Sequence, residues 1–266
     1  MEHLSLAERV KKALEAGVDQ FGGESCPEMI IELVRSGQVT ESRIDQSVRR
    51  ILREKFRLGL FDHPLVDPAA AEQIVGNAAF RAAGELAQRK AIVLLKNGEI
   101  PAGHILPLHG KPRLYAENVS LEAASAYGQV VSNLEEADLA LLRLQSPYEP
   151  RNKLFLESFF HAGDLDFKEP EKSRILSILS KVPTVVDIYL DRPAVIPEIA
   201  AQSAGLLASF GASDAAVLDV VFGRFAPTGR LPFELPSSME SVRRQKEDLP
   251  HDSENPLFPF GHGLSY

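Results

Sequence analysis

Residues 1–61 place apolar side chains at helical spacing, in three runs that short polar breaks separate. Ser5 and Glu8 form a capping-box pattern before the first run, the second run follows Pro27, and the third opens at Thr40. The pattern therefore predicts three helices, each with one apolar face. The positions on those faces include Val10, Leu14, Ile30, Leu33, Leu52 and Phe56.

The pattern changes at residues 62–72. Pro64 and Pro68 lie in this stretch, and prolines this close together do not continue a helix, so we predict a linker. An alanine-rich run then predicts one long helix over roughly 69–89.

Beyond the linker, short apolar runs alternate with helical patterns. Unbroken apolar runs of this kind are typical of strands that are buried on both faces of a mostly parallel sheet. The alternation therefore predicts an α/β fold with a doubly wound, mostly parallel sheet. The expected strands are 91–95, 114–116, 138–144, 184–190 and 205–210, and the expected helices are 121–127, 170–181, 194–202 and 213–223. The tail after Gly223, rich in proline and glycine, predicts an extended segment that wraps the domain.

Composition narrows the class of protein. The 266 residues carry 29 Lys and Arg against 37 Asp and Glu, and this acidic balance disfavours a nucleic acid partner, which needs a basic face. The single Cys26 excludes an intramolecular disulfide, and zinc-site spacings such as CxxC and HExxH are absent. No apolar run is long enough to span a membrane, and the first residues lack a signal-peptide layout, so we expect a cytoplasmic protein without metal.

Phosphate-binding and nucleophile-elbow motifs are missing from the chain. No GxGxxG follows the first expected strand, and no GxxxxGK[ST] occurs, so a dinucleotide or P-loop site is disfavoured and no cofactor is expected.

Ser213 follows a strand but not in a GxSxG context, and it is better interpreted as a helix N-cap. His262 lies between two glycines, where an imidazole that hydrogen-bonds the backbone of a tight turn is the better interpretation.

Several side chains that can take part in catalysis or ligand binding lie in one loop. Glu157, His161, Asp164 and Asp166 follow the strand that ends near Leu144, among aromatic side chains. Loops at the carboxyl ends of parallel strands carry ligand chemistry, and carboxylates beside aromatic rings suit a sugar site. An ordinary surface loop with an Asp-based turn accounts for the same residues equally well, and the residues alone leave both interpretations open.

The end of the chain resembles a known family. Residues 220–233 (VVFGRFAPTGRLPF) and 259–266 (PFGHGLSY) are similar to the last motifs of family 3 of the glycoside hydrolases, the β-glucosidase and β-xylosidase-like enzymes. Segments along most of the chain fit the same family in order, while residues 100–170 are divergent. These segments are 16–19 (AGVD), 33–37 (LVRSG), 44–45 (ID) with 48–52 (VRRIL), 55–61 (KFRLGLF) and 90–97 (KAIVLLKN).

The resemblance implies a two-domain enzyme. A (β/α)8 barrel precedes a linker and a six-stranded α/β sandwich, with the active site between the two domains. It also implies hydrolysis of β-linked glycosides with retention, through an aspartate nucleophile on the barrel and a carboxylic acid/base that commonly comes from the sandwich. Two carboxyl groups about 5–5.5 Å apart suit that double displacement.

The chain departs from the family pattern at its beginning. The family's nucleophile lies in a Ser-Asp-Trp-like motif some tens of residues before the segment that corresponds to Ala16–Asp19, but only 15 residues precede Ala16 and the chain has no Trp. We therefore expect residues 1–61 to be residual helices of a truncated (β/α)8 barrel, its last unit and closing helices. Residues 62–72 would be the linker, and 73–266 the C-terminal sandwich domain with an extended tail.

The function implied is that of a partial β-glucosidase-like enzyme, inactive alone. Its sandwich would supply the acid/base, for which Glu157 is the first candidate and Asp164 and His161 are alternates. The expected ligand is a β-linked glucoside or a related small saccharide. Expected partners are a separate barrel chain or further copies of this chain, bound through exposed N-terminal helices. The alternatives are a non-catalytic carbohydrate-binding or subunit domain and, from another class, a nucleotide-binding α/β regulator.

Overall fold

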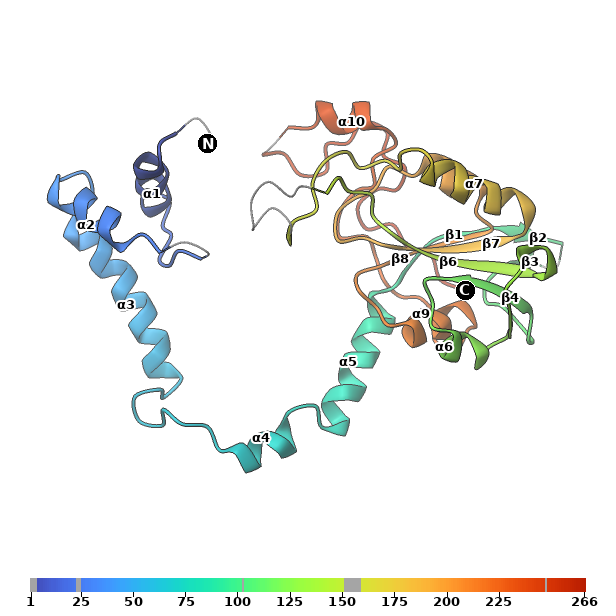
Figure 1. Cartoon of the computed structure of the whole chain (residues 1–266), viewed down its shortest axis with the longest axis horizontal. Helices are drawn as coiled ribbons and strands as arrows, with labels where there is room; N and C mark the ends of the chain where they lie inside the picture. The colour runs from blue at the N-terminus through green and yellow to red at the C-terminus, as the bar shows by residue number, and fades with distance from the viewer. Residues whose placement is uncertain (1–3, 23–24, 102, 151–158, 247) are drawn as a thin grey trace. The chain divides into compact units, whose positions relative to one another are not determined.

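A computed structural model describes the chain from residue 4 to residue 266, apart from 23–24, 102, 151–158 and 247. The chain divides into two units, Met1–Asn77 and Ala78–Tyr266. The first unit is helical, and the second contains the main sheet (Figure 1).

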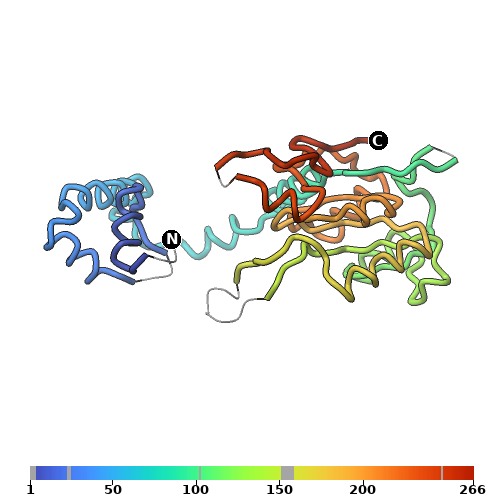
Figure 2. The backbone as a smooth tube through the Cα atoms, turned by 90° about the horizontal axis from the view of Figure 1, so that it is seen from above, coloured from blue at the N-terminus to red at the C-terminus, as the bar shows by residue number. Residues whose placement is uncertain are grey.

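The helices expected in residues 1–61 are present in the first unit (Figure 2). They are α1 (Leu6–Glu15), α2 (Pro27–Arg35) and α3 (Glu41–Arg57). Ser5 and Glu8 form the predicted capping box at the start of α1. Four of the apolar side chains on and beside these helices form a small buried cluster, consisting of Val10, Leu14, Leu33 and Val39.

Hydrogen bonds and ion pairs connect α3 to the end of α1 and to the residues that follow it. Arg43 donates hydrogen bonds to the main-chain oxygens of Leu14 at 2.7 Å and Val18 at 3.0 Å. Asp19 accepts from the Ser47 hydroxyl at 2.8 Å and from the guanidinium of Arg50 at 3.0 Å. The hydrogen bond from Ser47 and the nearby arginines lower the pKa of Asp19. The Ala16–Asp19 segment therefore has a structural role in this unit.

The alanine-rich stretch differs from the expected single helix. It forms α4 (Pro68–Ile74) and α5 (Ala78–Ala91), with Gly76 between them at a positive φ of 65°. Asp67 caps α4 and Pro68 occupies its first position, where a proline does not cost a hydrogen bond. Pro68, which the sequence pattern assigned to the linker, therefore begins a helix instead.

The second unit is built on a six-stranded sheet that is parallel except at one edge. Only β1 runs antiparallel to its neighbour, so the predicted doubly wound, mostly parallel α/β fold is confirmed. In spatial order the strands are β1 (Val93–Asn97), β8 (Gly205–Ser209), β7 (Thr184–Tyr189), β6 (Leu139–Gln145), β4 (Arg113–Glu117) and β5 (Gln129–Val131).

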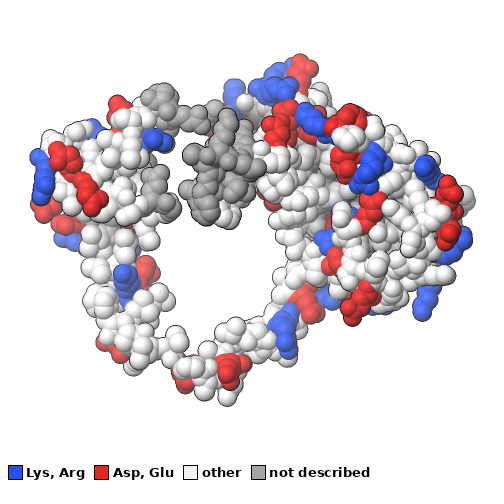
Figure 3. Space-filling model, viewed as in Figure 1, with Lys and Arg blue, Asp and Glu red and all other residues white. Residues whose placement is uncertain are grey.

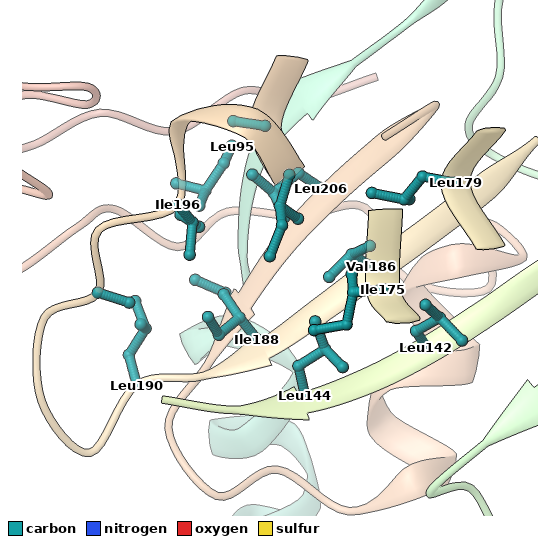
Figure 4. Packing of buried hydrophobic residues seen from close by; sticks show 14 of the residues in the cluster. Leu95, Leu142, Leu144, Ile175, Leu179, Val186, Ile188, Leu190, Ile196 and Leu206 are labelled. Carbon is teal, nitrogen blue, oxygen red and sulfur yellow. The ribbon is translucent and has the colours of Figure 1, made fainter. Parts of the chain in front are cut away.

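Helices cover both faces of the sheet. One face packs on α7 (Glu171–Lys181) and α8 (Pro197–Gln202), and the other packs on α6 (Leu121–Ser125) and α9 (Asp214–Val221). Figure 1 shows α7 on one side of the sheet and α6 and α9 on the other. Successive strand residues alternate between the two cores, which explains why the central strands are mostly apolar on both faces. Figure 4 shows the core beneath α7, where Leu142, Leu144, Ile175, Leu179, Val186, Ile188 and Leu206 meet.

Several short elements were not expected from the sequence. They are the edge strand β5, the hairpin of β2 (Glu99–Ile100) and β3 (Gly103–His104), the 3₁₀ turn η1 (Leu134–Glu136), and α10 (Met239–Arg244) in the tail. Each spans six residues or fewer, which is too short for a hydrophobic period to show.

The tail wraps the β1 edge of the sheet as predicted. Leu264 pairs with Leu94 of β1 through a hydrogen bond of 2.8 Å. The ring of His262 bonds the main-chain oxygen of Leu95 at 2.9 Å, so its predicted structural role is confirmed. Ser213 caps α9, also as predicted.

Candidate functional site

The candidate site lies on the loop that leaves the carboxyl end of β6. The segment from Ser146 to Phe167, which the structure describes at 146–150 and 159–167, contains every residue predicted for acid/base chemistry. His161 and Asp164 are in its described part, whereas Glu157 lies outside the described residues. The structure therefore places two of the three predicted residues.

The end of β7 holds this loop at its start. The Ser146 hydroxyl donates to the main-chain oxygens of Tyr189 at 2.7 Å and Arg192 at 3.0 Å, and the side chain of Ser146 is buried. The loops after β6 and β7 are thereby joined at the sheet edge, as expected for neighbouring parallel strands whose carboxyl ends share one edge.

His161 is held from two sides. Its Nδ1 forms a hydrogen bond with the carboxylate of Asp191, the second residue after β7. The ring stacks on Tyr148 with 3.8 Å between centroids and 12° between planes. A carboxylate bonded to Nδ1 fixes the tautomer of the imidazole. Nε2 is then the ring nitrogen that can exchange a proton. Within the described part of the candidate loop, His161 with Asp191 has a geometry that suits proton transfer.

Asp164 sits in a basic environment. It accepts a hydrogen bond from Lys168 at 2.8 Å and lies 3.3 Å from the guanidinium of Arg243. The Lys168 hydrogen bond, assisted by Arg243, lowers the pKa of Asp164, although partial burial opposes the effect. Asp164 therefore favours its ionised form, which suits a proton acceptor better than a donor. Lys168 also bonds Asp166 at 2.7 Å, so Asp166 lies in the same cluster.

Three residues of this site were missed in the sequence analysis. Tyr148, Asp191 and Arg192 flank the loop, and Arg192 donates to the main-chain oxygen of Gly163 at 2.6 Å. A signal was present, because Asp191 and Arg192 directly follow an apolar strand next to the loop-bearing strand. Which loops meet at the sheet edge depends on strand order, and the sequence pattern does not give that order.

A buried ionic network supports the sheet edge below the loops. Arg143 of β6 donates to Asp187 of β7 at 2.9 Å, to Asp214 at 2.5 Å and to the main-chain oxygen of Ala212 at 2.8 Å. Burial raises the pKa of Asp187, and the charge of Arg143 opposes this. One carboxylate oxygen of Asp187 has no hydrogen-bond partner among the described residues. Because Arg143 uses all three nitrogens in the fold, we assign it a structural role.

In the described part of the chain, no group of three His, Cys, Asp or Glu side chains is arranged to hold a metal ion. None of the described helices has the length and apolarity required to cross a membrane. Acidic and basic side chains are interspersed over the face seen in Figure 3.

Comparison with known proteins decides the family. Residues 118–266, more than half of the chain, match the Glycosyl hydrolase family 3 C-terminal domain. The chain belongs to family 3 of the glycosyl hydrolases. The resemblance inferred from the sequence motifs is therefore confirmed, and the family 3 match includes the whole candidate loop and the tail that wraps β1.

Curated family 3 relatives match along the whole chain. "Beta-glucosidase C" of Emericella nidulans is 53% identical over 271 residues, which are 100% of this chain and 43% of the relative. The "Periplasmic beta-glucosidase/beta-xylosidase" of Dickeya chrysanthemi is 42% identical over 270 residues, 100% of this chain and 40% of the relative. The chain thus spans less than half the length of these relatives.

Solved structures agree on the fold. A crystal structure of β-glucosidase from Listeria innocua in complex with glucose superposes with a TM-score of 0.70 at 19% identity, covering 98% of this chain and 44% of that chain. At this identity the likeness concerns the fold. It extends over both units of the family 3 chain.

Proposed function

We propose that this chain is the C-terminal part of a retaining β-glucosidase-type enzyme. Its second unit would supply the acid/base side of the active site, and a barrel outside this chain would supply the nucleophile. The observation that carries the proposal is the 53% identity to Beta-glucosidase C along 100% of this chain but only 43% of the relative. Because more than half of the relative has no counterpart here, hydrolysis would need the remainder.

The proposed substrate is a β-linked glucoside or a related small saccharide. The relatives are named as β-glucosidases and a β-glucosidase/β-xylosidase, and related structures from Listeria innocua contain glucose or laminaribiose. The candidate loop has the matching chemistry, with carboxylates, an imidazole and the ring of Tyr148 close together.

The proposed chemistry is double displacement. A nucleophile on the barrel would attack the anomeric carbon while a group of the Ser146–Phe167 loop protonates the leaving oxygen. The same group would then take a proton from the water that hydrolyses the glycosyl-enzyme. Glu157 remains our first candidate for that group. His161, oriented by Asp191, is the second, and the lowered pKa of Asp164 makes it the least suited to donate a proton.

A chimera tests the proposal. The N-terminal part of Beta-glucosidase C that this chain lacks is fused ahead of residue 1, and hydrolysis of p-nitrophenyl β-glucoside is compared with that of this chain and of the N-terminal part alone. We expect turnover by the chimera only. A folded chimera that binds a glucoside but never hydrolyses it would contradict the catalytic proposal and favour a non-catalytic carbohydrate-binding role.

A subunit role is a second candidate, favoured by apolar exposure in the first unit. Phe56 is 64% exposed and Phe61 54% exposed, and their rings contact each other at 4.6 Å between centroids. Exposed apolar surface of this kind marks an interaction site. A separate barrel chain, or a second copy of this chain, would cover it. Light scattering of the purified chain, alone and mixed with the separate N-terminal part of Beta-glucosidase C, distinguishes self-association from heterodimer formation.

A further inference from the structure

A hollow of about 260 Å³ lies at the end of the sheet where its parallel strands begin. Its wall includes His109, Gly110 and Lys111, which come just before β4, and Tyr127, two residues before β5. Because β4 runs parallel to both β5 and β6, the hollow and the candidate loop lie at opposite ends of the strands. The hollow is therefore separate from the candidate functional site.

The wall of this hollow is basic. His109, Lys111 and Arg224 line it, and none of the described residues in its wall is an aspartate or a glutamate. The side chains of His109 and Lys111 form no ion pair or hydrogen bond with any residue that the structure describes. This local excess of positive charge contrasts with the acidic balance of the whole chain, which has 29 Lys and Arg against 37 Asp and Glu.

The ring of Tyr127 holds Arg224 in place. The guanidinium carbon lies 4.0 Å from the ring centroid, and Tyr127 itself is buried. Asp219 lies 3.9 Å from the same guanidinium, but it already pairs with Arg89 at 2.6 Å and accepts the hydroxyl proton of Tyr127 at 2.6 Å. The charge of Arg224 is therefore positioned by stacking and only weakly compensated.

Two helices end beside the hollow, and their terminal carbonyl groups are satisfied by other donors. Unpaired carbonyls at a helix end attract basic side chains and would compete with an anionic ligand for them. At the end of α9, Val221 accepts from the main-chain N–H of Leu108 at 2.9 Å. At the end of α6, Ala124 accepts from the main-chain N–H of Tyr127 at 3.0 Å. The basic side chains of the wall are therefore not used as helix caps.

Main-chain donors add to the basic wall. The N–H groups of His109, Gly110 and Lys111 donate to no acceptor within the described residues. Gly110 has a positive φ of 75°, so the chain turns at this point. Consecutive N–H groups at such a turn can form a concave site for an anion. The hollow thus combines free amide donors with two cationic side chains and an imidazole.

We propose that this hollow binds a small phosphomonoester, an inference that does not depend on the proposed function. Guanidinium, ammonium and main-chain N–H groups are the donors with which proteins bind phosphate oxygens. A phosphate dianion makes better use of several positive groups than a carboxylate with one charge. The volume is below the roughly 300–1,000 Å³ of drug-sized ligands, so the site suits a small ester rather than a whole nucleotide.

The test is an NMR titration of the whole ¹⁵N-labelled chain in phosphate-free buffer at constant ionic strength. Glycerol 1-phosphate is the probe, glycerol is the neutral control and lactate is the anion with a single charge. We expect saturable shifts of the Gly110 and Lys111 amides with a Kd of about 1 mM or lower, no shift with glycerol, and at least about tenfold weaker binding of lactate. Lack of saturation below about 10 mM glycerol 1-phosphate would overturn the site.

Two further ligands test the ligand class. Inorganic phosphate should bind more weakly than glycerol 1-phosphate, and tighter binding of the free ion would overturn the assignment to an ester. Adenosine 5′-monophosphate should bind no more tightly than glycerol 1-phosphate, because the hollow has no room for the base. A gain of about tenfold with the nucleotide would overturn the assignment to a small ligand.

Variants locate the site. Lys111→Gln and Arg224→Gln should each weaken glycerol 1-phosphate binding about tenfold, whereas Arg224→Lys keeps the charge and should retain most of the affinity. Lys181→Gln is the matched control, because it removes an exposed lysine at the end of α7, on the other face of the sheet. Amide shifts outside the hollow show that each variant is folded. Equal affinities of Lys111→Gln and Lys181→Gln would overturn the proposal whether or not the chimera hydrolyses glucosides.

Discussion

The guanidinium of Arg192 donates a hydrogen bond to the main-chain oxygen of Gly163 at 2.6 Å, across 29 residues of sequence. The preceding residue, Asp191, bonds His161 two positions before Gly163. Two consecutive residues at the end of β7 therefore hold two nearby points of the candidate loop. Both residues lie in the bend just after β7, so they attach the candidate loop to the end of a central strand of the sheet.

We expect Arg192→Ala to loosen the candidate loop without unfolding the sheet. The substitution removes the hydrogen bond to Gly163, and a hydrogen bond to a charged group contributes about 1.5–3 kcal/mol. Amide hydrogen exchange at residues 160–166 should become faster, while exchange in β6 and β7 stays near its original rate. Arg81→Ala, which removes an exposed arginine of α5, is the control and should change neither segment.

The acid/base candidates can be distinguished in the chimera. Glu157→Gln should slow hydrolysis of substrates with poor leaving groups far more than hydrolysis of activated aryl glucosides, because only the former need a proton on the leaving oxygen. General acid–base catalysis typically accelerates a reaction roughly 10²–10⁴-fold. Added azide should restore turnover of the activated substrate, since azide attacks without a general base.

His161→Gln and Asp164→Asn are the companion variants for that measurement. Equal loss on both substrate types in Glu157→Gln, without azide rescue, would indicate a packing role for Glu157. The residue whose variant then shows leaving-group dependence and rescue is the acid/base. We expect His161 to show it before Asp164, because Lys168 lowers the pKa of Asp164.

The sequence pattern predicted the sheet better than the site. Strands such as Thr184–Tyr189 are buried over nearly their whole length, and their largely apolar runs identify them without knowledge of their neighbours. The three-residue β5 and the break at Gly76 carry no such pattern. At the site, His161 and Asp164 were identified by their residue types, by their loop after an expected strand and by the family resemblance. Their partners Asp191, Arg243 and Tyr148 come from segments that only the strand order and the path of the tail bring together.

We expect the chain by itself not to hydrolyse aryl β-glucosides. The proposed double displacement needs two carboxyl groups, and the nucleophile is expected on the part of the protein that this chain lacks. The measurement is release of p-nitrophenol by chain purified from a host without glycosidases of its own. Sustained turnover that scales with chain concentration and survives repeated purification would refute this expectation.

Acid should weaken the second unit through paired carboxylates. Hydrogen bonds from Arg174 lower the pKa of Glu171 below its ordinary value of 4.5, and the hydrogen bond from Lys172 does the same for Glu198. A lowered pKa in the folded state adds stability above the unfolded pKa, and that stability is lost as the pH falls through the folded pKa. The free energy of unfolding should therefore decline below about pH 4.5.

The pH effect has its own control. Glu171→Gln should cost only about 0.2–1 kcal/mol at pH 7, since the pair is partly exposed, and should make the acid decline shallower. Glu122→Gln removes an exposed carboxylate of α6 and should leave the shape of the decline unchanged. The buried Asp187 acts in the opposite direction, because burial raises its pKa. A stability that rises as the pH falls below 4.5 would mean that Asp187 dominates.

Limited proteolysis should cut the chain between residues 58 and 77 and leave the second unit intact. This stretch exposes Leu65 at 87% and Val66 at 83%, and its backbone has little buried structure to protect it. The first unit has a small core of its own around Leu14 and Leu33, so it should persist briefly before it is degraded. Mass spectrometry of the fragments and light scattering of the uncut chain provide the measurement.

If the exposed side chains near Phe56 are covered by a second copy, cleavage should slow as protein concentration rises, and Phe56→Ser should remove that dependence. Uniform resistance of a strictly monomeric chain would show that this stretch is protected within a single molecule.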